Sequence, residues 1–163
     1  MQWRRSCPLT TDMTQIVLVE PEIPPNTGNV ARTCAATGTP LHLVEPLGFE
    51  ISDRQLRRAG LDYWPHVPLK CHSDWAAFHF SQQQLGGRLL GFSRHASRSY
   101  LDCDYSNDDW LLFGCETRGL PDHVRNACDV LLQIPMPCKA VRSLNLSVAV
   151  GIVLFEARRQ LGS

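Results

Sequence analysis

Residues 16–44 read IVLVEPEIPPNTGNVARTCAATGTPLHLV, and this stretch decides the fold class. Its two ends, residues 16–19 and 41–44, are short apolar runs of the kind found in buried strands. Between them, Asn26 can cap a helix that runs through Thr37, and Gly38 suits the position after the last turn. A strand, a helix and a second strand of this length predict a parallel pair with a right-handed crossover.

The same alternation continues to the C-terminus. Further helices are expected at residues 54–58, 75–84, 121–127 and 143–160. Further strands are expected at residues 88–92, 110–113 and 130–134, with a polar loop at 93–108. Because these strands are apolar throughout rather than alternating, we predict an α/β fold with a mostly parallel sheet flanked by helices. Residues 1–15 are polar and are expected to form a poorly ordered extension before one domain at 16–163.

Composition narrows the class of protein. The 163 residues are 44% hydrophobic and 20% charged, which fits one globular domain, and the net charge of zero excludes a strongly basic nucleic-acid binder but allows local basic patches. No apolar run reaches about 18 residues, so no membrane span is expected. The seven cysteines form no Cys-x-x-Cys pair, which favours reduced thiols in the cytoplasm. No metal is expected, although Cys71 and His72 with distant partners leave a zinc site as an alternative.

Several familiar nucleotide-binding and catalytic motifs are missing. The turn after the first strand is rich in proline and has no G-x-G-x-x-G, and the chain has neither a P-loop nor a G-x-S-x-G elbow. A nucleotide-binding dehydrogenase is therefore a distant alternative.

Three polar segments stand at predicted strand ends, where ligands bind in open α/β sheets. The first, residues 26–32, offers Asn26, Asn29 and Arg32 at a helix start, a combination that suits a phosphate or a ribose. Its simpler interpretation is an ordinary cap and a surface arginine. The second, residues 112–121, carries a carboxylate and an arginine between glycines that permit close approach of a ligand. Its simpler interpretation is a tight turn with a surface ion pair.

The third segment, residues 134–147, places three polar side chains, Ser143, Asn145 and Ser147, in a very apolar helix start. Buried polar groups need partners, so these side chains are candidate site residues. In the simpler interpretation, Ser143 caps the helix and Asn145 bonds a neighbouring loop. The helix that follows is apolar on nearly all sides, which predicts a homodimer through it, with complete burial inside a monomer as the alternative.

Together these segments, with residues 20–29 and 56–63, resemble the SPOUT (SpoU–TrmD) superfamily of RNA methyltransferases over residues 16–162. Within it the chain is similar to the small tRNA (cytidine/uridine-34) 2′-O-methyltransferases of the TrmL or YibK type. The resemblance implies a C-terminal deep trefoil knot, a homodimer, and S-adenosylmethionine as cofactor with S-adenosylhomocysteine as product. It also implies methyl transfer to the ribose of the tRNA wobble nucleotide, a cytidine or modified uridine of leucine isoacceptors.

The resemblance assigns roles to individual positions. The catalytic positions are Arg32, Asn26, Glu116 and Asn145. The cofactor-binding positions are Phe92, Gly114, Gly119, Ile134, Ser143 and Leu144. The RNA-binding candidates are Arg57, Arg58, Arg94 and Lys139.

The reaction itself needs alignment of oxygen, methyl carbon and sulfur. An arginine has a pKa of roughly 12.5–13.8 and is a poor base, so we expect Arg32 to hold a phosphate and stabilise a developing alkoxide. Two alternatives are a related enzyme acting on another tRNA or rRNA nucleotide, and a non-catalytic RNA-binding module with the same fold.

Overall fold

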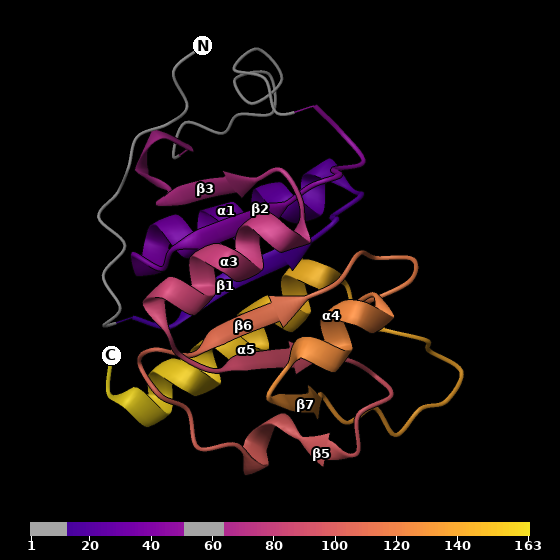
Figure 1. The fold of residues 1–163 in the computed structure, drawn as a ribbon. Coiled ribbons are helices and arrows are strands. Elements are labelled where there is room, and N and C mark those ends of the chain that lie inside the picture. Colours follow the sequence, from indigo (N-terminus) through magenta and orange to yellow (C-terminus); the bar gives the residue numbers. More distant parts are fainter. Residues whose placement is uncertain (1–12, 51–63) are drawn as a thin grey trace.

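A computed structural model describes residues 13–50 and 64–163 of the chain (Figure 1). Within these residues the strands form one seven-stranded sheet in the order β3-β2-β1-β6-β4-β7-β5, and every pair is parallel. The strands are β1 (Gln15–Val19), β2 (Leu41–Val44), β3 (Leu69–His72), β4 (Leu89–Phe92), β5 (Arg98–Ser99), β6 (Trp110–Phe113) and β7 (Val130–Gln133). The predicted α/β class with a parallel sheet is therefore confirmed.

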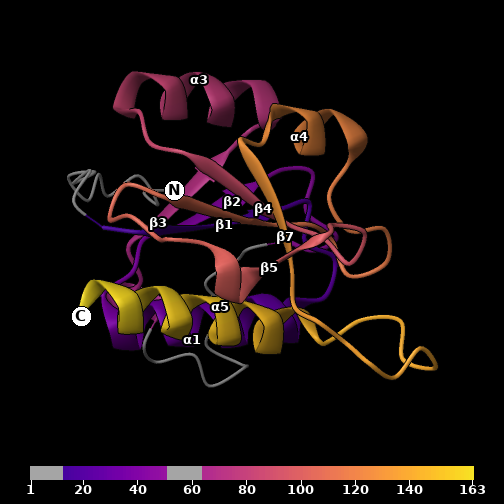
Figure 2. The ribbon, with the colours of Figure 1, turned by 90° about the horizontal axis from the view of Figure 1, so that it is seen from below.

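Helices cover both faces of the sheet. Figure 2 shows α1 (Pro24–Thr37) and α5 (Leu146–Leu161) below it, and α3 (Trp75–Leu85) and α4 (Asp122–Ala127) above it. Two short 3-10 turns, η1 (Trp64–His66) and η2 (Tyr100–Asp102), complete the described elements. In this part of the chain, every helix is too short or too polar to traverse a lipid bilayer.

The sheet is buried on both faces because alternate residues of its central strands enter different cores. In β1, Ile16 and Leu18 join the core under α1 and α5, whereas Val17 and Val19 join the core under α3. All four side chains are at most 1% exposed. This double burial explains why the strands read as continuous apolar runs.

Several element boundaries differ from the predictions. Helix α1 begins at Pro24 and not after Asn26, and helix α5 begins at Leu146, so Ser143 does not cap it. Strand β3 was not predicted from the sequence, and the predicted loop at 93–108 contains the two-residue strand β5 and the turn η2. The helix predicted at 54–58 lies outside the described residues.

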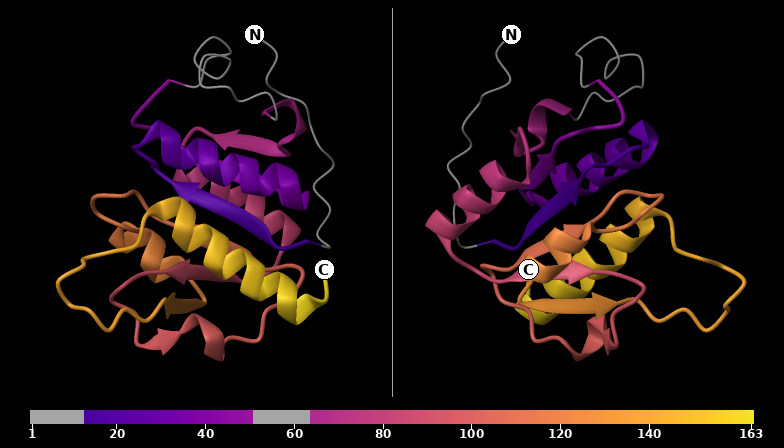
Figure 3. Two further views of the ribbon diagram at one scale, coloured as in Figure 1. Left: turned by 180° about the vertical axis from the view of Figure 1, so that it is seen from behind. Right: turned by 45° about the vertical axis from the view of Figure 1, so that its right-hand side comes forward.

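The carboxyl ends of the central strands define the part of the fold that matters for function. Phe113 of β6 is in register with Leu18 of β1 and with Phe92 of β4, and Phe92 is in register with Leu132 of β7. The connections that leave these four strands therefore start at one edge of the sheet. After β7, the chain runs through a long extended connection before α5, which crosses the same face as α1 (Figure 3).

Candidate functional site

The carboxyl edge of β4, β6 and β7 gathers three predicted cofactor-binding positions. Phe92 ends β4, Gly114 follows β6, and Ile134 follows β7. The strand ends are tied together because the amide of Ser93 donates to the carbonyl of Leu132 at 2.9 Å. Positions separated by up to 42 residues in sequence thus share one rim of the sheet.

Side chains from all three polar segments form a continuous hydrogen-bonded chain at this edge. Asn26 Nδ2 donates to Glu116 Oε1 at 3.1 Å, and Asn145 Nδ2 donates to Asn26 Oδ1 at 2.8 Å. Asn145 Oδ1 in turn accepts from the Ser147 amide at 2.9 Å and from its hydroxyl at 2.7 Å. We call Asn26, Glu116, Asn145 and Ser147 the edge network. It unites three of the four predicted catalytic positions.

The edge network also satisfies the amino ends of two helices. The residue before α1, Ile23, provides no side-chain cap, and Glu116 from another part of the chain binds the backbone just before the helix. Its carboxylate accepts from the amides of Glu22 at 2.9 Å and Ile23 at 3.2 Å. Asn145 caps α5 through the Ser147 amide. A carboxylate at a helix N-terminus is favoured by both hydrogen bonding and the helix dipole.

The loop from Gly114 to Leu120 folds tightly on itself. The Gly119 amide donates to the Cys115 carbonyl at 2.9 Å. A Cβ at position 114 would lie 2.0 Å from the Gly119 carbonyl carbon, so Gly114 is needed for the approach of the loop to its own backbone. Gly119 has a φ of 73° with nothing within 4 Å of a Cβ, so its surroundings are open. The sequence suggested that both glycines permit close approach of a ligand, but only Gly119 has open space beside it.

The other predicted site residues lie outside the edge network, on α1 and on the connections around it. Arg32 is on the exposed side of α1, within two turns of Asn26. In the segment before α5, Ser143 is exposed and Leu144 is half-buried. Arg94 and Lys139 are also exposed, and Arg94 Nη1 donates to the Arg142 carbonyl at 3.3 Å. The other two RNA-binding candidates, at positions 57 and 58, lie outside the described residues.

Two residues of the site, Glu22 and Thr117, were not singled out by the sequence analysis. Glu22 Oε2 accepts from the Thr117 hydroxyl at 2.7 Å and from the Thr117 amide at 3.3 Å. Arg118 lies beside them, with Nη2 3.6 Å from Glu20 Oε2 and 3.7 Å from Glu22 Oε1. One signal could have identified Glu22. It is a carboxylate shortly after β1, where the strand order reverses and ligands commonly bind.

A second polar group of side chains is buried inside the sheet. His42 Nε2 lies 2.8 Å from Gln15 Oε1, and His42 Nδ1 lies 2.9 Å from His72 Nε2. Because the amide oxygen can only accept, His42 donates to Gln15 from Nε2, and a neutral His42 then accepts from His72 at Nδ1. Burial is the main cause that lowers the pKa of His42 to about 3 and that of His72 to about 4. We call Gln15, His42 and His72 the histidine cluster.

The histidine cluster bears on the zinc alternative. Cys71 is exposed whereas His72 is 5% exposed and engaged with His42, as expected for neighbours on a strand that point to opposite faces. Among residues 13–50 and 64–163, no three potential ligands are grouped to hold a metal ion. Cys71 and His72 are therefore not arranged as a ligand pair.

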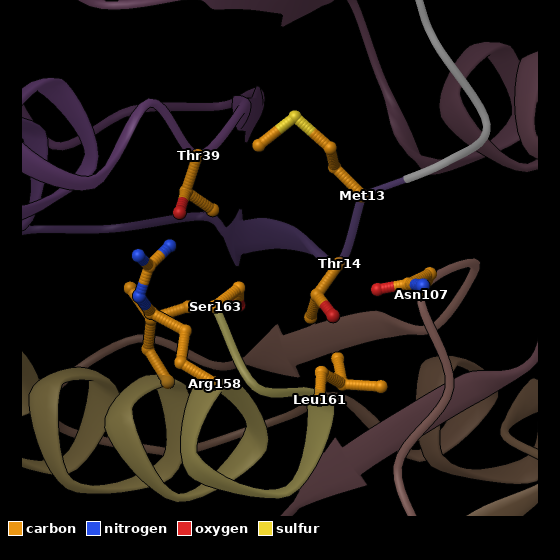
Figure 4. A pocket seen from close by; sticks show the side chains of 8 residues that line it. Met13, Thr14, Thr39, Asn107, Arg158, Leu161 and Ser163 are labelled. Carbon is orange, nitrogen blue, oxygen red and sulfur yellow. The ribbon is translucent and has the colours of Figure 1, made fainter.

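One small cavity lies at the other end of the sheet (Figure 4). It is lined by Thr14, Thr39 and Asn107, which precede strands, and by Arg158 near the end of α5. The amino ends of the strands are opposite the rim that carries the edge network. None of the predicted site residues lines this cavity, so it is separate from the candidate site.

Known proteins resemble this chain in both sequence and fold. The sequence matches the SpoU rRNA Methylase family profile over residues 13–155. A Polaromonas sp. protein named tRNA (cytidine(34)-2'-O)-methyltransferase is 49% identical, covering 92% of this chain and 92% of that protein. A solved structure described as giving structural insights into the 2-OH methylation of C/U34 on tRNA has a TM-score of 0.85 and 51% identity, covering 94% of this chain and 99% of that one.

A third similar protein was solved with its cofactor. The AdoMet-bound rRNA methyltransferase from Sinorhizobium meliloti is 32% identical with a TM-score of 0.82, covering 93% of this chain and 57% of that one. The family profile spans most of the chain and includes all four residues of the edge network. The chain therefore belongs to the SpoU rRNA methylase family, a family of methyltransferases.

Proposed function

We propose that this protein transfers a methyl group from S-adenosylmethionine to the ribose 2′-oxygen of the tRNA wobble nucleotide, position 34. The observation that carries the proposal is the 49% identity over 92% of both chains to a tRNA (cytidine(34)-2'-O)-methyltransferase. The substrate base is cytidine or a modified uridine, and leucine isoacceptors are the first tRNAs to test. As an enzyme of tRNA modification it would act in the cytoplasm, and residues 16–163 would form its single domain.

The residues at the strand edge fit the proposed cofactor. Phe92 and Ile134 are partly buried apolar side chains packed against one core, which suits an adenine ring. The open space beside Gly119 and the exposed Ser143 hydroxyl offer room and a polar contact. Gly114 and Leu144 complete the proposed set. When bound, S-adenosylmethionine supplies an electrophilic methyl group on its sulfonium, with S-adenosylhomocysteine as product and no metal required.

The proposal includes the trefoil knot of the family. Residues 134–145 leave β7 and return to the start of α5 at the same edge of the sheet, and β4 lies between β6 and β7. This arrangement supports threading of the C-terminal part through the preceding connections. The backbone of the threaded segment would then form one wall of the cofactor site.

Arg32 is the proposed catalytic side chain. Its guanidinium would bind a phosphate next to the target ribose and stabilise charge that develops on the 2′-oxygen. Asn26, Glu116 and Asn145 would act by fixing the helix start that carries Arg32 and the segment before α5. Arg32→Lys keeps the charge but loses the two-pronged geometry. Turnover near the wild-type value in this variant would contradict the role given to Arg32.

A homodimer through α5 is part of the proposal. Val148 is 50% exposed and Phe155 is 57% exposed, although both belong to a helix whose other face is buried in the core. Their spacing of seven residues places them on the same side of the helix. A second copy of the chain would cover these side chains. Sedimentation of Phe155→Glu tests this contact, since a charge in an apolar interface should shift the protein toward monomer.

RNA would meet exposed cations near the site. Arg94 and Lys139 are exposed on connections that leave the same sheet edge, and Arg57 and Arg58 belong to the proposed set by sequence. Phosphate contacts predict tRNA binding that weakens steeply with salt. Substitution of Arg94 or Lys139 by alanine should reduce both the affinity and the steepness of this salt dependence.

The decisive experiment is tritiated-methyl transfer from S-adenosylmethionine to total tRNA, followed by mapping of the labelled nucleotide. Label on the ribose of position 34 supports the proposal. Label elsewhere in tRNA, or on rRNA, would identify a related enzyme with another target. Calorimetry with S-adenosylmethionine addresses the non-catalytic alternative, because a module without catalysis would not bind the cofactor.

A further inference from the structure

The segment after β1 and the loop after β6 are joined by two carboxylates, one from each segment. Glu116 from the loop accepts from the amides of Glu22 and Ile23 at 2.9 and 3.2 Å. Glu22 from the segment accepts from the hydroxyl and amide of Thr117 at 2.7 and 3.3 Å. Each side therefore holds the other, and the two segments are 94 residues apart in sequence.

This exchange determines how the loop at 114–120 is attached. The loop is closed on itself by the Gly119-to-Cys115 hydrogen bond and by the contact of Gly114 with the backbone of Gly119. Glu116 is explained by the edge network and by its bonds to the backbone just before α1. The Glu22 side chain bonds no side chain of that network, and its hydrogen bonds go to Thr117, two residues before the open backbone at Gly119.

We propose that Glu22 is a positioning residue for the cofactor site, acting through Thr117. The inference rests on the proposed function, because Gly119 belongs to the proposed cofactor-binding set. By holding Thr117, Glu22 keeps the Gly119 side of the loop in place before the ligand arrives. Binding then requires less ordering of the loop, which increases affinity without any direct contact between Glu22 and the ligand.

The Thr117 hydroxyl allows a matched pair of variants. Thr117→Val keeps the shape of the side chain but removes the donor, whereas Thr117→Ser keeps the donor. Glu22→Ala removes the oxygen that accepts both hydrogen bonds and the charge that faces Arg118. Thr117 is exposed, so none of its substitutions opens a cavity in the core. Ser81→Ala is the control, because it removes a surface hydroxyl that bonds Lys70 on the α3 side of the protein.

The first measurement is calorimetry of S-adenosylmethionine binding to the full-length variants. Loss of a charge-assisted hydrogen bond should weaken binding about 10-fold in Thr117→Val and somewhat more in Glu22→Ala. Thr117→Ser and the Ser81→Ala control should stay within about twofold of wild type. At saturating cofactor, kcat for tRNA methylation should be retained, so the effect falls on the KM for the cofactor.

The second measurement is amide hydrogen exchange without cofactor. The Thr117 amide should exchange faster in Glu22→Ala than in wild type, while amides in β6 are unchanged. Equal cofactor affinity of Thr117→Val and wild type would overturn the inference but leave the proposed function intact. So would failure of Thr117→Ser to restore binding. Absence of cofactor binding by the wild-type protein would overturn both.

Discussion

The edge network and the histidine cluster use similar bonds in different surroundings. Each joins three segments of the chain through side-chain hydrogen bonds. Gln15, His42 and His72 are 1–5% exposed and lie on the adjacent strands β1, β2 and β3. In the edge network Asn145 is exposed and Glu116 is half-buried, and both lie on segments outside the strands.

This difference separates stability from function. In the histidine cluster both ring nitrogens of His42 find partners on the neighbouring strands, and the rings of Phe78 and Trp110 pack against His42. In the edge network a carboxylate and two amides fix the starts of α1 and α5 next to open loops. We therefore expect changes in the histidine cluster to reduce stability, and changes in the edge network to reduce mainly activity.

The largest expected effect comes from His42→Ala. The substitution leaves buried polar atoms of Gln15 and His72 without partners and opens a cavity, so the free energy of unfolding should fall by about 3–5 kcal/mol. Urea unfolding at pH 7 measures this loss. His42→Leu fills most of the cavity but leaves the same polar atoms unpaired, so it should recover only part of the stability.

Cofactor affinity of the His42→Ala protein that remains folded should match wild type, because the substitution touches no residue of the edge network. A clear loss of cofactor affinity under conditions where the protein is folded would show that the two regions are coupled. A loss in stability below about 1 kcal/mol would contradict the structural role of the cluster.

The next largest effect is expected from Asn26→Leu, which breaks the edge network at its centre. Glu116 and Asn145 both lose their shared partner, so the rate of methyl transfer to tRNA should fall about 100-fold, equivalent to about 2.7 kcal/mol. Unfolding free energy should fall by about 1–2 kcal/mol, because Asn26 is only 7% exposed. Asn126→Leu, on the exposed side of α4, is the matched control. Wild-type turnover in Asn26→Leu would show that the edge network is not needed for methyl transfer.

The sequence predicts those elements that are set by local patterns. The strands β1, β2 and β6 contain at most one polar residue each and were found within one residue of their predicted bounds. Strand β3 was missed because the polar Lys70 and His72 interrupt its apolar pattern. His72 is buried only because His42, on another strand, provides its hydrogen-bond partner.

The helix starts show a second limit. Asn26 was predicted to cap α1, but Pro24 and Pro25 begin the helix earlier, since proline needs no hydrogen bond in a first turn. Asn26 is therefore in the first turn of the helix, where its side chain bonds Glu116 and Asn145 and not the helix backbone. Motifs identified these three side chains as site residues. Their pairing, across 90 and 119 residues, depends on the tertiary fold and could not be predicted.

A smaller effect, the pH dependence of the free energy of unfolding, should distinguish the histidine cluster from the edge network. The lowered pKa values of His42 and His72, about 3 and about 4, mean that the folded state binds protons less readily than the unfolded state. Their contribution to stability is complete above the unfolded pKa of about 6.5 and is lost as the pH falls toward the folded values. Between the unfolded and folded pKa values, each histidine should lower the free energy of unfolding by about 1.4 kcal/mol for each unit by which the pH falls.

Unfolding measured at pH 7, 6 and 5 tests this dependence. His42→Leu should have a shallower slope than wild type, since one of the two groups is gone. His123→Asn, an exposed histidine of α4, keeps the cluster intact and should retain the wild-type slope. Equal slopes for His42→Leu and wild type would contradict the assignment of the acid sensitivity to the cluster.

The smallest expected effect is that of Ser147→Ala, at the end of the edge network. The substitution removes the hydroxyl bond to Asn145 Oδ1 at 2.7 Å but keeps the Ser147 amide bond to the same oxygen at 2.9 Å. Asn145 therefore still caps α5 and stays oriented toward Asn26, and stability should fall by only about 0.5–1 kcal/mol. Methyl transfer should slow by about twofold, against the 100-fold expected for Asn26→Leu. A Ser147→Ala loss as large as that of Asn26→Leu would mean that the hydroxyl, and not the helix amide, orients Asn145, and the network would then depend on its exposed end rather than on its buried centre.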